Sequence, residues 1–131
     1  MFIPVNLRYT ANHLWLRPIG RKDIYVGITD YAQKELGRID SFEINCEGSI
    51  IRKDVPFGTI YGANKTIDLI MPRTGRILSL NGDVEINPRY LNSDTYHFWI
   101  ALISISDDDL QTRFLINEEY LALIKQTQII K

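Results

Sequence analysis

"VGITDYAQKELGRI", residues 26–39, carries the change from strand to helix and back to strand that organises this chain. Thr29 is suited to cap a helix and Asp30 to its first turn, while Gly37 suits the position just after a helix. We therefore expect a short helix within residues 29–37. Its expected inward face consists of Tyr31, Ala32 and Leu36. The apolar residues on both sides predict flanking strands.

The strand before this helix has a predicted partner. "HLWLRPI", residues 13–19, and "DIYVGIT", residues 23–29, are separated by Gly20, Arg21 and Lys22, which predicts a hairpin. The period of two places Trp15 and Arg17 on one face. Leu14 and Leu16 take the other face. After the helix, "RIDSFEI", residues 38–44, predicts a strand with Ile39, Ser41 and Glu43 opposite Asp40, Phe42 and Ile44.

The second half repeats short strands. "PFGTIYG" and "TIDLIMP" flank Ala63, Asn64 and Lys65, which predicts a tight turn between strands. Asn-Gly at 81–82 predicts another hairpin, between "RTGRILSL" and "VEIN". "FWIALISI", residues 98–105, predicts a central strand. A closing helix that Asn117 can cap would carry Tyr120, Leu121 and Ile124.

Many short strands with small helices favour a mainly β fold, a β-sandwich or flattened barrel, in one domain over residues 1–131. The formal net charge of −1 argues against nucleic acid or an anionic membrane as partner. No apolar run reaches the roughly 18 residues of a membrane helix. With a single cysteine, Cys46, and no signal-peptide pattern, we expect a cytoplasmic protein.

Residues able to perform catalysis are few. His13 and His97 are far apart and outside any metal-ligand spacing, and His13 is expected to be packed and hydrogen-bonded. Cys46 has no evident base partner. Asp107, Asp108 and Asp109 are expected to face water, since calcium ligands normally alternate with other residues. We expect no catalytic or metal site, and an enzyme using these residues is the minor hypothesis.

The order of motifs resembles the H protein of the glycine cleavage system over nearly the whole chain. "YTANHLWLR" (residues 9–17) resembles the family's Y-T-x-x-H-E-W-x-R, and residues 26–39 resemble V-G-I-T-x-x-A-Q-x-x-L-G-D-I. "PFG", "DL", "PRYLN" and "EEYLALI" follow in family order. The resemblance implies a lipoyl-type β-sandwich that acts as a carrier and not as an enzyme. Lipoate is attached in the family to a lysine at a hairpin apex.

The resemblance also implies partners. The family's arm takes an aminomethyl group from a pyridoxal-phosphate decarboxylase and passes it to a tetrahydrofolate-dependent transferase. A dihydrolipoamide dehydrogenase then reoxidises the arm. A long arm at an exposed turn can reach several active sites at high effective concentration. The expected partners are therefore other glycine cleavage proteins or lipoate-handling enzymes.

The register of the attachment motif departs from the family. P-F-G-x-x-E-S-V-K-A-x-x-D-L-x-x-P-x-x-G aligns without a gap to "PFGTIYGANKTIDLIMPRTG", residues 56–75. The family's lipoyl-lysine position then falls on Asn64, and Lys65 comes one residue later. Asparagine has no nucleophilic amine. Lys65 could serve only through a shifted turn, which changes the direction of its side chain.

Other differences concern the cleft that holds the loaded arm in the family, around His13, Leu14 and Tyr61 here. Leu14 replaces the acid between His and Trp, and Tyr61 replaces the acid before the lysine. "DTYHFW" (residues 94–99) also lacks the glycines of the family's D-P-Y-G-x-G-W. Two hypotheses follow. The first is a divergent binding or regulatory module without lipoate, and the second is a working aminomethyl carrier lipoylated at Lys65.

Overall fold

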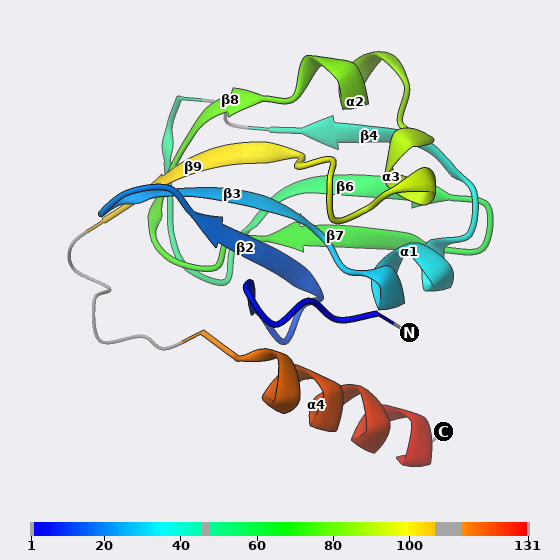
Figure 1. Cartoon of the computed structure of the whole chain (residues 1–131). Helices are drawn as coiled ribbons and strands as arrows, with labels where there is room; N and C mark the ends of the chain where they lie inside the picture. Colours follow the sequence, from blue (N-terminus) through cyan, green and yellow to red (C-terminus); the bar gives the residue numbers. More distant parts are fainter. Residues whose placement is uncertain (1, 46–47, 107–113, 131) are drawn as a thin grey trace.

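The described chain forms two antiparallel sheets with helices at their ends (Figure 1). The computed structural model describes residues 2–45, 48–106 and 114–130. The larger sheet has the spatial order β1 (Arg8–Tyr9), β2 (Leu14–Pro18), β3 (Asp23–Ile28), β9 (Ala101–Ile105), β8 (Gly75–Leu80) and β5 (Ile50–Ile51). The smaller sheet has the order β4 (Ile39–Ile44), β6 (Pro56–Gly62) and β7 (Thr66–Ile70). The helices are α1 (Asp30–Leu36), α2 (Gly82–Ile86), α3 (Tyr90–Ser93) and α4 (Asn117–Ile130). The mainly β, two-sheet prediction is confirmed.

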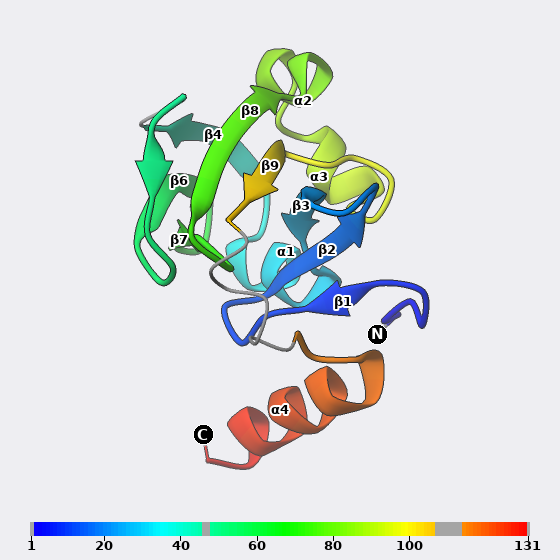
Figure 2. The ribbon, with the colours of Figure 1, turned by 90° about the vertical axis from the view of Figure 1, so that its left-hand side faces the viewer.

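The main core lies between the two sheets, as the alternation of β2 predicts. Leu14 and Leu16 point into this core with 1% and 0% of their surface exposed. Trp15 points the other way, into a second cluster with Tyr9 and Tyr120. The guanidinium of Arg17 lies 4.9 Å from the centre of the Trp15 ring. Helix α4 packs on this second cluster beneath β1 (Figure 2), so β2 joins both cores.

Helix α1 forms where its capping residues predict. The Thr29 side chain accepts a hydrogen bond from the Ala32 N–H at 3.2 Å, which satisfies one of the free donors of the first turn. Gly37 ends the helix with φ 74° and donates its N–H to the Gln33 carbonyl. Tyr31, Ala32 and Leu36 are buried, as expected. The helix therefore presents a fixed end to the smaller sheet.

Two expectations for this part of the chain were wrong. Asn81 caps a helix and does not turn a hairpin, because its side-chain oxygen accepts the Asp83 N–H and starts α2. In β4 the register shifts between Ile39 and Ser41, so the strict alternation fails there. This β-bulge buries Ile39 fully in the main core together with the partly buried Phe42.

The remaining elements agree with the sequence with two adjustments. Strand β9 is central, between β3 and β8, but it begins at Ala101 and not at Phe98. Asn117 is the first residue of α4, and the cap comes from Glu119, whose carboxylate accepts the Ile116 N–H at 2.9 Å. Within α4, Tyr120 and Ile124 are buried while Leu121 is 38% exposed.

Candidate functional site

The site is built on the hairpin tip, residues 63–65, which joins β6 to β7. The Gly62 N–H donates to the Lys65 carbonyl at 3.0 Å and closes the turn, as the sequence predicts. The tip does not stand free in solvent. Ala63 donates its N–H to the Arg38 carbonyl at 2.8 Å, and Asn64 donates its N–H to the Leu36 carbonyl at 2.9 Å. Backbone hydrogen bonds therefore fasten the tip to the end of α1.

Two glycines allow this close approach. A Cβ added at Gly62 would overlap the Leu36 carbonyl oxygen. A Cβ added at Gly37 would lie 2.7 Å from the Asn64 side-chain nitrogen. The Asn64 amide is thus in contact with the turn that ends α1, and it carries no amine to which a carboxylic acid could be joined. The residue that the sequence motif aligns with the family's attachment position therefore offers no amine for lipoate.

Lys65 lies beside a cleft of about 440 Å³ between the tip, α1, the loop before β2, and α4. Its Nζ is 3.9 Å from a Glu35 carboxylate oxygen, with 49% of the Lys65 side chain exposed. This cleft is lined by Ala11, Asn12, His13, Tyr31, Ala32, Glu35, Lys65, Ile67, Asp68, Ile70 and Thr127. Its lining combines apolar side chains with the carboxylates of Glu35 and Asp68, the imidazole of His13 and the amine of Lys65.

His13 joins the cleft to the C-terminal helix. Its Nδ1 lies 2.8 Å from the Tyr120 hydroxyl, which lies 2.6 Å from the Thr29 Oγ1. Burial lowers the pKa of His13, Glu35 acts to raise it, and Lys65 acts to lower it further. When the Tyr120 hydroxyl donates its single proton to Nδ1 of a neutral His13, the Thr29 hydroxyl donates to Tyr120 and still accepts the Ala32 N–H. That order leaves the His13 proton on Nε2.

Tyr31 and Tyr120 fix the position of the imidazole. The His13 ring is 4.7 Å from the Tyr31 ring and 5.8 Å from the Tyr120 ring, and its backbone has φ 70°. Burial raises the pKa of Tyr120 well above its usual value, so this hydroxyl stays protonated. The packed, hydrogen-bonded His13 that the sequence predicts is present, and it also lines the cleft.

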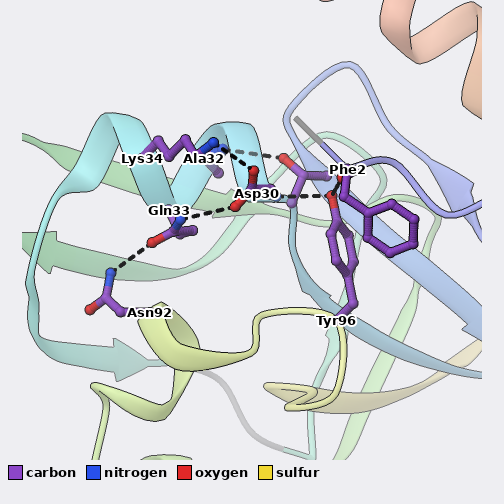
Figure 3. Close-up of polar contacts among 8 residues, drawn as sticks. Phe2, Asp30, Ala32, Gln33, Lys34, Asn92 and Tyr96 are labelled. Atoms are coloured by element: carbon purple, nitrogen blue, oxygen red, sulfur yellow. Dashed lines mark hydrogen bonds and ion pairs between the residues drawn. The ribbon is translucent and has the colours of Figure 1, made fainter.

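The opposite side of α1 is held by a polar network centred on Asp30 (Figure 3). The Asp30 carboxylate accepts from Gln33 at 3.0 Å and pairs with Lys34 at 3.1 Å. The Asp30 N–H donates to the Tyr96 hydroxyl, and burial raises the pKa of Tyr96 to about 12. Asn92 donates to the Gln33 side chain at 2.9 Å. Held from this side, α1 is a firm support for the tip.

The other residues singled out by the sequence lie elsewhere. Leu14 is in the main core, and Tyr61, 36% exposed, is not among the residues that line the cleft. His97 packs edge-on against Phe98, away from the cleft. Cys46 and the aspartates at 107–109 lie outside the described residues. Residues 2–45, 48–106 and 114–130 contain no group of three metal-binding side chains and no helix able to span a membrane.

Sequence reasoning missed four residues that shape the site: Glu35, Asp68, Asn92 and Tyr120. Glu35 is one helical turn after Tyr31, and this i,i+4 spacing signals that both share a face of α1. Asn92 donates to the Gly37 carbonyl and accepts the Ile39 N–H, so it joins both sides of the α1–β4 turn. Tyr120 is 107 residues from His13, and no local pattern reveals their contact.

Comparison with known proteins identifies the family. A sequence profile described as Glycine cleavage H-protein matches residues 7–127. The chain belongs to this family. It is 35% identical over 127 residues to the glycine cleavage system H protein of Brevibacillus brevis, covering 96% of this chain and 100% of the relative. The H protein of Clostridioides difficile is 34% identical, over 88% of this chain and 93% of its own length.

A solved structure agrees with the fold of this H-protein family member. The crystal structure of a glycine cleavage system H protein from Mycobacterium marinum superposes with a TM-score of 0.79. At 23% identity, the match covers 94% of this chain and 99% of that chain. H proteins are non-catalytic carriers within a multienzyme system, which confirms that this chain is not an enzyme in its own right. The family normally carries lipoate and works with the other glycine cleavage proteins.

Proposed function

We propose that this H-protein homologue does not carry lipoate and works as a binding or regulatory module toward glycine cleavage proteins or lipoate-handling enzymes. The observation that supports this most directly is Asn64 at the family's attachment position. Its backbone is fastened to Leu36 and its amide lies against Gly37. Amide formation with lipoate needs a free amine at this point of the turn.

Lys65 does not replace the missing amine in this proposal. Its ion pair with Glu35 is a weak obstacle, because a pair this exposed contributes about 0–1 kcal/mol. The position on the turn is the stronger argument. One residue along a hairpin changes the direction of the side chain, and Lys65 extends along α1 toward the cleft. A modifying enzyme that reads the geometry of the tip would meet Asn64 where it needs the lysine.

Intact-mass analysis after co-expression with a lipoate ligase and lipoic acid tests the proposal. We expect the wild-type chain to remain unmodified. The double variant Asn64→Lys, Lys65→Ala moves the single amine of the tip to the attachment position and is expected to gain one lipoyl adduct. The H protein of Brevibacillus brevis serves as the positive control. A lipoyl adduct on the wild-type chain that is lost in Lys65→Arg would overturn the proposal.

The second candidate is a working aminomethyl carrier modified at Lys65. One observation favours it: about half of the Lys65 side chain is exposed, so the amine is accessible. A reconstituted glycine decarboxylation assay distinguishes the two. Activity that requires this chain and disappears in Lys65→Arg supports the carrier. Equal activity with and without Lys65 contradicts it.

A further inference from the structure

A second groove lies on a different part of the molecule, between β4 and α2. It has a volume of about 400 Å³, and Figure 1 shows β4 on the side of the smaller sheet that faces α2. The groove is lined by Asp40, Ser41, Phe42, Ile44, Leu80, Glu85, Ile86 and Pro88. Ile86 is 86% exposed beside this groove, whose lining combines apolar side chains with Ser41 and two acids. None of these residues belongs to the cleft near Lys65.

The groove runs along an open strand edge. Among the described residues, β4 pairs with β6 alone. The Asn45 N–H donates to the Phe57 carbonyl at 2.9 Å, which marks a hydrogen-bonded pair of this ladder. Such pairs alternate along antiparallel strands, so Glu43 also bonds inward. The N–H and C=O groups of Phe42 and Ile44 therefore point outward, available to another strand.

The charges beside this edge are negative. The lining contains Asp40 and Glu85 and no basic side chain. Asp40 is already paired with Arg38 at 2.9 Å, so Glu85 and the exposed Glu43 supply most of the attraction for a cation. A second copy of this chain pairing edge to edge would bring these acids together, which disfavours self-association.

We propose that this groove binds an extended segment of a partner protein that alternates apolar and basic side chains. The segment adds a strand to β4 through the outward backbone groups of Phe42 and Ile44. Its apolar side chains share the face of Phe42 and Ile44 and pack on Ile86 and Leu80. Its basic side chains lie on the opposite face beside Glu43, and Glu85 adds to the negative field at this edge. The inference concerns a surface remote from the hairpin tip, so it does not depend on whether the tip is modified.

A short blocked peptide that alternates arginine and valine is the probe. We expect calorimetry to detect binding, and NMR hydrogen exchange to show new protection of the Phe42 and Ile44 amides. The same peptide N-methylated at every residue keeps its charge but has no N–H groups to donate to the Phe42 and Ile44 carbonyls, and should not bind. Binding of the methylated peptide with equal affinity, or no new protection at these amides, would overturn strand addition.

Charge and apolar variants test the rest of the proposal. Glu43→Lys, Glu85→Lys should weaken binding by roughly tenfold, since two screened attractions become repulsions. Ile86→Ser, at an exposed position, should also weaken it without loss of stability. Glu118→Lys on α4 is the matched control and should bind as the wild type does. Equal weakening by the control, or sedimentation showing that the free chain dimerises through this groove, would refute the assignment.

Discussion

Gly37→Ala tests how firmly the hairpin tip is held. Gly37 has φ 74° and ψ −150°, a region of backbone angles that is essentially restricted to glycine. Alanine there should cost about 1–3 kcal/mol in the free energy of unfolding. The new methyl would also lie 2.7 Å from the Asn64 side-chain nitrogen and force that side chain off its rotamer. This displacement adds about 0.5–1.5 kcal/mol.

Urea denaturation of Gly37→Ala, Asn64→Ala and the double variant separates these two contributions. Asn64→Ala alone should change stability by less than about 0.5 kcal/mol, since its backbone makes the hydrogen bond and its side chain is exposed. The double variant should recover only the part due to the displaced side chain. Hydrogen exchange at the Ala63 and Asn64 amides should accelerate in both Gly37→Ala variants.

Gly82→Ala is the matched control for the backbone argument. No atom lies within 4 Å of a Cβ added at Gly82, and its φ is not positive, so this change should be neutral or slightly stabilising. The reasoning is refuted if Gly37→Ala costs no more than this control. It is also refuted if Asn64→Ala restores full stability to Gly37→Ala, since the backbone cost should remain.

Four further predictions concern His13, Tyr120 and Gly27. Because burial lowers the His13 pKa below its usual value of about 6.5, the unfolded chain takes up the proton first, and stability should fall as pH drops below that value. Denaturation at a series of pH values should show this loss in the wild type and not in His13→Asn. NMR titration should show a higher His13 pKa in Lys65→Ala and a lower one in Glu35→Gln, and shifts of equal sign would contradict the charge argument. Tyr120→Phe should lower the free energy of unfolding in urea by about 1–3 kcal/mol, because His13 and Thr29 lose their hydrogen-bond partner while the ring remains. Gly27→Ala should cost about 1–3 kcal/mol or more in thermal unfolding, because its methyl would overlap a buried indole, and unchanged stability would show that the ring can move.

Capping residues close to α1 allowed this helix to be predicted, whereas turn residues that suit two structures led to a wrong hairpin prediction at Asn81. Thr29 and Gly37 act within one helix, so their roles can be read from neighbouring residues. Asn81 with Gly82 suits both a tight turn and a helix start, and only the Asp83 N–H contact decides between them. The bulge in β4 accompanies the burial of Ile39, and the strand pattern alone shows neither.

The hairpin tip was predicted correctly as a turn, but its surroundings were not. The family pattern assigns a position to Asn64, while the docking of the tip on α1 depends on the Leu36 and Arg38 carbonyls. The contact of Lys65 with Glu35 likewise joins residues from different elements. Long-range packing determines these contacts, and one sequence contains no periodic signal for them.

The hydrogen bonds that hold the hairpin tip on α1 do not depend on the side chain at position 64. The long-range hydrogen bonds of the tip come from the main chain, at Ala63 and Asn64, and main-chain groups are the same whatever side chain a codon specifies. A substitution at position 64 can therefore abolish a covalent attachment without unfolding the domain. Loss of the side chain at this position therefore carries little penalty in folding.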